Sequence, residues 1–453
     1  MKVTAVLLAA GQGTRMKSSL PKVLHPLCGK PMLWHVLEAL KETTTEKPVV
    51  VVGHGAEAVT QYLGAGAQTV LQEPQLGTGH AAMQAETVLR GQTDYVIVTY
   101  ADMPLLRGET FKRLVETQRL NPGPLSLLTV IADDPRGFGR IVRNADGTVQ
   151  AIVEEYVATP EQQAIKELNV GAYCFKADWF WDALHRIEKN PKKGEYYLTD
   201  IVEIAVRDNL PVQAVVHDDF GETIGINTRV HLSEAEAAMR QRINHGHMLN
   251  GVSMMDPAST YIEAGITIGR DTLLMPNTYL HGTTVIGEGN VIGPNTIIRD
   301  TQIGNRNKLL ASVMEGAVIE DDVDMGPFAR LRKGAHLKSH VHMGNFGEVK
   351  DSTLHEGVKM GHFSYIGNAN IGANTNIGAG TITCNYDGEK KHATEIGEDV
   401  FIGSDTMLVA PLKLGAGART GAGAVVTKNV AEDTLVVGMP ARAIKKLERK
   451  RKR

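Results

Sequence analysis

The sequence predicts two folds in one chain: an α/β domain with a mostly parallel, doubly wound sheet, followed by an all-β parallel β-helix. Two observations indicate this. In the C-terminal part of the 453 residues, an aliphatic side chain returns at every sixth position. Such a period fits neither a helix nor a strand and is typical of a prism with one inward-pointing aliphatic residue on each short face. In the N-terminal half, short apolar runs alternate with helical patterns, which favours a parallel sheet.

The N-terminal half supplies the elements of the sheet in order. The loop Gly11–Arg15 follows the first apolar run, and Asp102 follows a later one. Ligands of doubly wound sheets lie outside the carboxyl ends of the strands, so both features are expected at the binding edge. The expected elements are strands at 3–8, 49–52, 69–72, 95–99 and 125–130, and helices at 32–41 and 56–63.

A linking helix is expected between the two folds, at residues 230–249. Ser233 and Glu236 have the spacing of a capping box, and apolar residues continue at helical spacing through Ile243. The expected division is therefore a first domain at 1–229, the helix, and a repeat domain at 250–453 that ends in a basic tail.

The repeat begins at Ile262 and runs, with one-residue slips, to Leu414. Glycine often follows the aliphatic residue, as at Gly372, which predicts corners with positive φ or with close approach of two backbones. The repeat stops between Ile377 and Ile396. An interruption of this kind predicts a functional loop that projects from the prism.

The composition argues against several classes of protein. The formal net charge is −3, and the basic tail has no interleaved aromatic residues, so nucleic-acid binding is not expected. Cys28, Cys174 and Cys384 show neither metal-ligand spacing nor a disulfide framework, which indicates a reducing cytoplasm. The apolar N-terminal run is short and is followed by charged residues, so it is expected to be a buried strand rather than a signal peptide. No stretch approaches the roughly 18 apolar residues that span a bilayer.

The loop after the first strand has the chemistry of a polyphosphate site. Gly11 and Gly13 let backbone N–H groups approach an anion, and Arg15 and Lys22 add positive charge. Asp102 is the hard oxygen ligand that Mg²⁺ prefers when it also bridges phosphates. The loop lacks the third glycine of the dinucleotide fingerprint and the Gly-Lys-Ser/Thr of a P-loop, so neither of those sites is supported. Taken alone, the glycine pair is also compatible with an ordinary tight turn.

Three segments of this half resemble the sugar-phosphate nucleotidyltransferases. Residues 8–22, L-A-A-G-x-G-T-R-M-x(5)-P-K, resemble their signature loop, and residues 72–81, Q-x-x-Q-L-G-T-G-H-A, resemble their uracil-binding segment. Residues 194–200, G-E-Y-Y-L-T-D, match a further motif of that family. The resemblance implies that Arg15 and Lys22 are catalytic and that Asp102 and Asn227 hold Mg²⁺. Contacts to UTP or UDP-N-acetylglucosamine are implied for Leu8, Ala9, Ala10, Gly11, Gly13, Gln72, Gln75, Gly77, Thr78, Tyr100, Gly139, Glu154, Asn169 and Asn227.

The chain departs from the usual pattern of that family at two positions. Ala101 stands where glycine is more usual, and Phe138 stands where tyrosine is more usual. An added methyl group near the ribose and a missing hydroxyl predict changed affinity rather than lost activity.

The repeat domain resembles the hexapeptide acyltransferases. The whole chain resembles the bifunctional bacterial UDP-N-acetylglucosamine pyrophosphorylases and glucosamine-1-phosphate N-acetyltransferases. That resemblance implies a left-handed β-helix, a homotrimer with sites between neighbouring prisms, and His362 and Asn385 as catalytic residues. Contacts to glucosamine-1-phosphate are implied for Arg332, Lys350, Tyr365, Asn376 and Lys391, and contacts to acetyl-coenzyme A for Ala379, Asn385, Tyr386, Ser404, Ala422 and Arg442.

Two reactions are expected. His362, whose imidazole titrates close to neutral pH, takes a proton from the amine of glucosamine-1-phosphate as the amine attacks acetyl-coenzyme A. Cys384 is expected to pack rather than to form an acyl-enzyme. At the other site, the phosphate of N-acetylglucosamine-1-phosphate attacks the α-phosphorus of UTP and expels pyrophosphate, with Mg²⁺ bridging the phosphates. The product, UDP-N-acetylglucosamine, is a precursor of the cell envelope.

Two alternatives give the repeat domain a different role. In one, only the nucleotidyltransferase is active and the β-helix serves oligomerisation or regulation; the polar cluster from Arg332 to Lys391 argues against it. In the other, the chain is a non-enzymatic assembly subunit. The charged residues retained in the first site argue against that.

Overall fold

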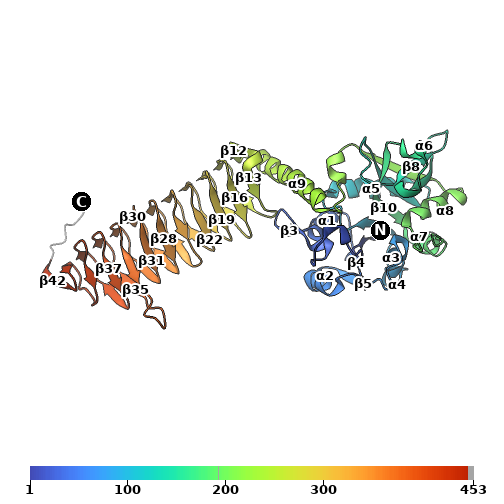
Figure 1. Ribbon diagram of the computed structural model, residues 1–453. Coiled ribbons are helices and arrows are strands. Elements are labelled where there is room, and N and C mark those ends of the chain that lie inside the picture. The colour runs from blue at the N-terminus through green and yellow to red at the C-terminus, as the bar shows by residue number, and fades with distance from the viewer. Residues whose placement is uncertain (192, 447–453) are drawn as a thin grey trace. The chain divides into compact units, whose positions relative to one another are not determined.

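The computed structural model describes residues 1–191 and 193–446. Two compact units divide the chain between Met239 and Arg240, inside helix α9 (Arg229–Leu249). The first unit consists of helices around a sheet, and the second is a stack of short strands (Figure 1). Residues 447–453, which belong to the predicted basic tail, lie outside the described residues.

The strands of the first unit are β1 (Val3–Leu8), β2 (Pro26–Leu27), β3 (Lys30–Pro31), β4 (Val49–Val52), β5 (Gln68–Leu71), β6 (Tyr95–Tyr100), β7 (Leu125–Ile131), β8 (Arg140–Arg143), β9 (Val149–Val153), β10 (Glu167–Lys176) and β11 (Val212–His217). The main sheet has the order β11-β7-β10-β6-β1-β4-β5, and the β8–β9 hairpin attaches to β10. The neighbours from β6 to β5 are all parallel, so the predicted sheet is confirmed.

Helices cover both faces of this sheet. They are α1 (Met32–Leu40), α2 (Ala56–Leu63), α3 (Thr78–Gln84), α4 (Glu86–Leu89), α5 (Gly108–Leu120), α6 (Pro160–Gln163), α7 (Ala177–Leu184) and α8 (Ile201–Arg207). Successive residues of a strand point to opposite faces of the sheet, so each strand contributes side chains to two hydrophobic cores. Leu7 of β1 belongs to the core that contains residues of α1, α2 and α5, whereas Val6 belongs to the core that contains residues of α3, α7 and α8.

Strand β10 was not predicted, because its long apolar run has no alternating pattern. It runs antiparallel to both β6 and β7, between which it lies. Its pairing with β7 shifts between Asn169 and Tyr173, and Gly171 within this bulge has a φ of +83°. A bulge of this kind re-aims side chains, and here it sets Gly171 against the ring of Tyr100.

Helix α9 begins at Arg229, so the predicted capping box at Ser233 and Glu236 is wrong. Ser233 lies inside the helix, and the Glu236 carboxylate accepts a hydrogen bond from the backbone N–H of Cys28 at 2.8 Å. The capping role belongs to Thr228, whose hydroxyl accepts from the backbone N–H of His231 at 3.2 Å. A threonine that accepts from the third helical residue satisfies one of the free N–H groups of the first turn.

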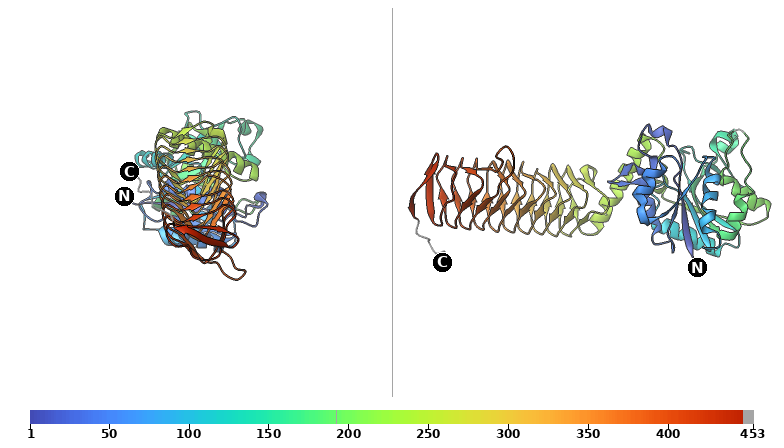
Figure 2. Two further views of the ribbon diagram at one scale, coloured as in Figure 1. Left: turned by 90° about the vertical axis from the view of Figure 1, so that its left-hand side faces the viewer. Right: turned by 90° about the horizontal axis from the view of Figure 1, so that it is seen from below.

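The second unit is a parallel β-helix whose three sheets are named here by their first strands, β12 (Ser253–Met254), β13 (Thr260–Ile262) and β14 (Thr267–Ile268). Successive strands visit the three sheets in turn, and the coils superpose when viewed along the stack (Figure 2). The side chains of Asn277 and Asn295, 18 positions apart, hydrogen-bond between neighbouring coils.

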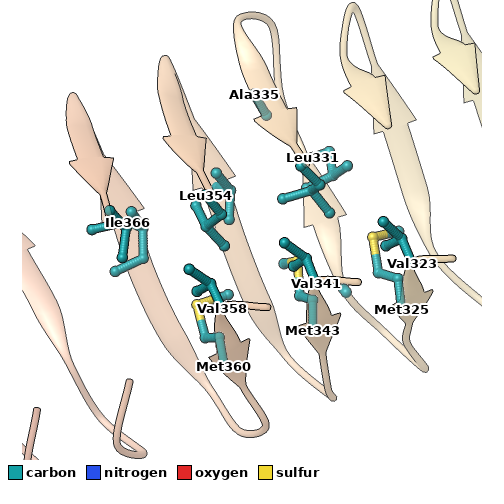
Figure 3. Packing of buried hydrophobic residues seen from close by; sticks show 14 of the residues in the cluster. Val323, Met325, Leu331, Ala335, Val341, Met343, Leu354, Val358, Met360 and Ile366 are labelled. Carbon is teal, nitrogen blue, oxygen red and sulfur yellow. The ribbon is translucent and has the colours of Figure 1, made fainter. Parts of the chain in front are cut away.

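The aliphatic residues of the predicted repeat fill the inside of this prism. Leu331, Met343, Leu354 and Ile366 are fully buried and point inward from four different strands of the stack (Figure 3). Coil-to-coil packing of this kind buries one continuous core along the stack. Between Ile298 and Ile319 the repeat continues through residues that the sequence analysis passed over, which are Ile303, Leu309 and Met314.

The corners of the prism explain the glycines and many of the asparagines and aspartates. A Cβ at Gly372 would lie 2.4 Å from the carbonyl carbon of Gly397 in the next coil, so close backbone approach requires glycine there. Other corners have a positive φ without glycine, as at Asp271 (60°) and Asn295 (52°). Asn and Asp tolerate the left-handed region better than other residues with a Cβ.

The strands that carry the second predicted site belong to two of the sheets. In the β12 sheet they are β30 (Lys359–Met360), β33 (Asn376–Ile377), β36 (Phe401–Ile402), β39 (Arg419–Thr420) and β41 (Thr434–Gly438), which pairs with β42 (Ala441–Lys446). In the β13 sheet they are β25 (Arg330–Leu331), β28 (Gly347–Lys350), β31 (Ser364–Gly367), β34 (Ile382–Cys384), β37 (Met407–Val409) and β40 (Val425–Val426).

Candidate active sites

A cleft of about 450 Å³ opens where β1, β5 and β6 end. This is the edge of the sheet at which the sequence predicts the ligand. Gln12 and Glu195 also line the cleft, although neither was predicted as a contact. Gln12 stands between the two glycines of the loop, at the position that the motif leaves open. Glu195 was seen only within the family motif at 194–200. The predicted residues that line the cleft are Leu8, Ala9, Ala10, Gly11, Lys22, Gln72, Gln75, Gly77, Thr78, Tyr100 and Asp102.

Four predicted polar side chains meet at one end of this cleft. The Lys22 ammonium group donates to the Asp102 carboxylate and, at 2.7 Å, to the amide oxygen of Asn227. The Arg15 guanidinium donates to the same amide oxygen at 3.0 Å. The predicted metal ligands and the predicted catalytic cations therefore form one cluster, drawn from three separate parts of the chain.

The two loop glycines have different roles. A Cβ at Gly11 would meet nothing within 4 Å, so the backbone there is open to a ligand. Gly13 has a φ of +61°, and a Cβ there would lie 2.8 Å from the Cβ of Lys22. Gly13 thus lets the loop pack against the stem of Lys22, which holds that lysine beside Asp102.

The segment predicted to bind uracil is held from outside by residues 195–198. The backbone N–H of Gly79 donates to the carbonyl of Tyr196 at 2.8 Å, and the Thr78 hydroxyl accepts from the N–H of Leu198 at 3.0 Å. Inside the segment, the Gln72 amide donates to the carbonyl of Gly77 at 2.9 Å. A Cβ at Gly77, whose φ is +96°, would lie 2.6 Å from the Tyr196 carbonyl oxygen.

The residues predicted to contact the sugar adjoin one another beyond Tyr100. The N–H of Asn169 donates to the carbonyl of Gly139 at 2.9 Å, and the Asn169 amide donates to the Tyr173 hydroxyl at 2.7 Å. The Glu154 carboxylate accepts from Thr199 at 3.1 Å, and burial raises the pKa of this carboxyl group. Tyr173 was not predicted, and Thr199 was seen only within the family motif at 194–200, because each acts through a hydrogen bond that only the fold reveals.

Tyr100 lies between the residues predicted to bind the nucleotide and those predicted to bind the sugar. Burial raises the pKa of its hydroxyl, and the charges of Glu154 and Asp102 add to that shift. A Cβ at Gly171 would lie 2.4 Å from the Tyr100 ring, so the ring packs directly on the bulge of β10.

One of the two departures from the family pattern lies elsewhere than predicted. The side chain of Ala101 is fully buried in the core with Phe111 and Leu114 and does not line the cleft. The predicted methyl group near the ribose is therefore wrong. Phe138 packs against the same core, and its ring would lie 3.4 Å from a Cβ at Gly225.

The second predicted site has a cationic cluster at one edge of the β13 sheet. Arg332 donates to the Glu348 carboxylate at 2.9 Å, which raises the pKa of the guanidinium group. The pKa of Lys350 is lowered, chiefly by the neighbouring Lys391 ammonium group and then by burial and by Arg332. Three positive charges so close together favour an anionic ligand such as a phosphate ester. Glu348 was not predicted.

Tyr365 and Asn385 lie beside this cluster. Tyr365 pairs with Glu348 on the neighbouring strand, and the buried Asn385 amide donates to the Asn368 side chain at 2.7 Å. A Cβ at Gly367 would lie 2.5 Å from the Tyr365 hydroxyl and 2.7 Å from the Asn385 amide nitrogen. Gly367 therefore keeps open the space between two groups that could orient a substrate.

A second row of predicted residues lies at the corner where the chain passes from the β12 sheet to the β13 sheet. The row consists of His362, Ala379, Ser404 and Ala422, one in each of four successive coils. Backbone hydrogen bonds join these turns: Asp405 N–H donates to the Ala379 carbonyl at 2.6 Å. His362 is exposed.

Within one chain the structure does not bring all predicted residues of the second site together. His362 lies just before the start of β31. Gly367 lies at the end of β31 and pairs with Lys350. The histidine and the cationic cluster therefore lie at opposite ends of the strands of the β13 sheet. Asn376 lies on the β12 sheet. Arg442 lines a separate cavity of about 520 Å³ together with Lys428, at the last coils.

The loop between β34 and β35 (Thr394–Ile396) carries Tyr386 and Lys391 and projects from the stack (Figure 1). Asp387 orders it by accepting from the backbone N–H groups of Glu389 and Lys390, both at 2.8 Å, and from the His392 ring at 2.6 Å. These contacts lower the pKa of Asp387. Burial raises the pKa of the Cys384 thiol, so that thiol is a poor nucleophile.

The fold and the two clusters define a transferase with a nucleotidyltransferase unit and a hexapeptide-repeat unit. The family model for the MobA-like NTP transferase domain matches residues 5–154, and the model for the bacterial transferase hexapeptide (six repeats) matches residues 265–300. The expected combination of a Rossmann-like domain with a left-handed parallel β-helix is confirmed.

Relatives match nearly the whole chain. "Bifunctional protein GlmU" of Geobacillus thermodenitrificans is 48% identical over 97% of this chain and 95% of its own length. The protein of that name from Lactococcus lactis is 46% identical over 100% of this chain and 98% of its own. The chain belongs to the family of bifunctional GlmU proteins. Among the described residues, no helix is both long enough and apolar enough to cross a bilayer.

Proposed function

We propose that this enzyme makes UDP-N-acetylglucosamine in two steps, first transferring an acetyl group from acetyl-coenzyme A to glucosamine-1-phosphate and then a uridylyl group from UTP to the product. One observation carries the proposal: a single chain holds both a cluster of cations with oxygen ligands beside a nucleotide-sized cleft and a cationic cluster beside a hydroxyl and an amide on a β-helix. The sugar substrates of both steps are phosphate esters, and a cluster of cations at each site suits such a group.

The first site fits a divalent cation. Asp102 and Asn227 direct two oxygens at one point, where the Lys22 ammonium group now stands as a cation. These two residues would hold Mg²⁺, which would supply positive charge to the phosphates of the substrate. Arg15 and Lys22 would bind the triphosphate, and Gln72, Gln75 and the backbone at Gly77 would bind the base. The attacking phosphate is already an anion, so no general base is needed.

The sugar of N-acetylglucosamine-1-phosphate would lie beyond Tyr100, against Gly139, Glu154, Asn169 and Gly171. Glu154 and Asn169 would bind its hydroxyl and acetamido groups. Both side chains are already held, by Thr199 and Tyr173 respectively. Groups fixed before the substrate arrives lose little entropy when it binds.

In the acetyl transfer, at the second site, His362 would take the proton from the attacking amine. Arg332, Lys350 and Lys391 would bind the phosphate of glucosamine-1-phosphate, with Tyr365, Asn376 and Asn385 orienting the sugar. The corner row of Ala379, Ser404 and Ala422, with Tyr386 from the loop, would hold acetyl-coenzyme A, and Arg442 would bind its phosphates.

A trimer would complete this second site. Two halves of the site, the histidine corner and the cationic cluster, are separated within one chain by the width of the β13 sheet. A neighbouring prism that faces this sheet would bring the missing half. The proposal therefore includes a homotrimer, to be tested by sedimentation and by loss of acetyl transfer on dilution while uridylyl transfer persists.

The test of the two-step function uses purified full-length protein and measures two products. Glucosamine-1-phosphate with acetyl-coenzyme A should release free thiol, and N-acetylglucosamine-1-phosphate with UTP and Mg²⁺ should release pyrophosphate. Chelation of divalent cations should stop only the second reaction. Asp102→Asn should lower the rate of pyrophosphate release at least about a hundredfold. A rate near that of the unaltered protein at saturating Mg²⁺ would show that the metal assignment is wrong.

The main alternative is a nucleotidyltransferase whose β-helix is not catalytic. Pyrophosphate release without any thiol release, from a protein shown to be trimeric, would favour it. Arg332, Lys350 and His362 lie at exposed or partly exposed positions of one prism, and the buried Asn385 lies beside the cationic cluster. Their presence argues for catalysis.

A further inference from the structure

Lys22 occupies the position between the two groups assigned as metal ligands. Its ammonium nitrogen lies within hydrogen-bonding distance of both Asp102 and the Asn227 amide oxygen, at 2.7 Å from the latter. The Lys22 side chain is 13% exposed and that of Asp102 is 24% exposed. The ion pair is therefore largely shielded from water. Opposite charges attract each other more strongly in such a shielded environment than at a free surface.

The surrounding structure keeps the lysine at this position. Lys22 begins a short 3₁₀ helix that ends at Leu24, and its stem packs against the backbone of Gly13. Arg15 occupies the remaining side of the Asn227 oxygen at 3.0 Å. Lys22 thus contacts both residues assigned as metal ligands, and Arg15 contacts one of them, Asn227.

A divalent cation and this ammonium group cannot share the position. Binding of the metal requires the Lys22 contacts with Asp102 and Asn227 to break, and it places two positive charges side by side. A triphosphate changes that balance, because its oxygens offer the ammonium group a second partner within the same cleft. Phosphate oxygens also complete the ligand set of the metal.

We propose that Lys22 is an internal counter-ion of the metal site: it neutralises Asp102 in the free enzyme, opposes binding of a divalent cation, and moves to the phosphates when the nucleotide arrives. This rests on the proposed uridylyl transfer. It adds that metal and nucleotide bind cooperatively, because the nucleotide withdraws the competing cation. Cooperativity of this kind is a coupling between two ligands through one side chain that has two alternative partners.

The test measures binding of Mn²⁺ alone to the full-length protein without nucleotide, by electron paramagnetic resonance of the free ion. Lys22→Met keeps the length of the stem but removes the charge, and should tighten Mn²⁺ binding by about tenfold or more, the worth of a hydrogen bond to a charged group. Lys22→Arg keeps the charge and should leave binding weak.

Two further variants separate this effect from a general change in charge. Lys17→Met removes a charge from an exposed lysine nearby and should change the affinity by no more than about twofold, because exposed charges are screened. Adding Asp102→Asn to Lys22→Met should abolish the gain.

Equal affinities for Lys22→Met and Lys17→Met would overturn the proposal, and so would a gain that survives Asp102→Asn. Failure of the proposed function itself would appear separately, as absence of pyrophosphate release by the unaltered protein.

Discussion

The Tyr365 hydroxyl and the Asn385 amide converge on Gly367, where a Cβ would lie 2.5 Å from the hydroxyl oxygen and 2.7 Å from the amide nitrogen. Both atoms are at the ends of side chains, so an added methyl group would displace these groups rather than break the coil. The glycine therefore serves the geometry of the proposed acetyl-transfer site more than the fold.

Gly367→Ala should lower kcat/KM for acetyl transfer by about tenfold to a hundredfold, because displacement of positioning groups by about an ångström has effects of that size. Uridylyl transfer and the thermal midpoint should stay near those of the unaltered protein. Gly246→Ala is the matched control, since a Cβ there meets nothing within 4 Å. An acetyl-transfer rate equal to that of this control would argue that Tyr365 and Asn385 do not orient the substrate.

His362→Ala should lower acetyl transfer by roughly 10²–10⁴-fold, the usual contribution of a general base. Uridylyl transfer should be unchanged. The control is His355→Ala, since His355 follows a strand of the β14 sheet and pairs with Asn370 at 2.8 Å. Equal loss of both activities in His362→Ala would point to misfolding instead of lost catalysis.

Gly171→Ala should raise the KM for both substrates of uridylyl transfer and lower stability. The new Cβ would overlap the Tyr100 ring at 2.4 Å, and the φ of +83° would be strained for alanine. Gly147→Ala has the same φ of +83° but open space around the Cβ. Both variants should lose about 1–2 kcal/mol of stability to strain, but only Gly171→Ala should lose activity, about tenfold or more in kcat/KM. Equal kinetics in the two variants would remove Tyr100 from the site.

The free energy of unfolding should depend on pH through the titration of Asp200. Burial, with the charges of Glu203 and Glu154, raises the pKa of this carboxyl group to about 6. An unfolded aspartate titrates near about 4. Between about pH 4 and pH 6, the Asp200 carboxyl group therefore keeps its proton in the folded state but has lost it in the unfolded state. The resulting stability is fully present below about pH 4 and is lost as the pH rises through about 6.

Asp200→Asn removes this loss and should be more stable than the unaltered protein at pH 7.5, by about 1 kcal/mol once partial exposure is allowed for, with no difference near pH 4. Urea unfolding at the two pH values measures it. Asp208→Asn should behave oppositely at pH 7.5, because Arg186 lowers the pKa of Asp208. A constant difference between Asp200→Asn and the unaltered protein across this range would contradict the prediction.

The repeat was predictable because every face of the prism demands one buried aliphatic residue, so that the period is visible in the sequence. Ile303, Leu309 and Met314 were missed because repeated one-residue slips between Ile298 and Ile319 move them out of the six-residue phase. Strand β10 was missed for the opposite reason: both of its faces are buried, so its residues show no alternation. The cap of α9 was misplaced because Ser233 has the right spacing but lies one turn inside the helix.

The sites were predictable where a segment carries its own chemistry, as in the glycine loop and the segment from Gln72 to Ala81. Contacts between distant segments were not. Lys22 and Asn227 are 205 positions apart, and no local pattern relates them. Glu348 looked like an ordinary position of the repeat, and only the register of neighbouring coils brings it to Tyr365.

Because the chain of the second unit returns to the same face after one full turn of the prism, its length can change in units of a whole coil without rotating the later coils. Removing the 18 residues of one coil from the part before Arg330 would leave Tyr365, His362 and Asn385 facing as they do now. Removing a third of that number would turn the whole acetyl-transfer end by one face. Insertions and deletions in homologous genes should therefore come in full turns, a rule that sequence comparison can check without any protein in hand.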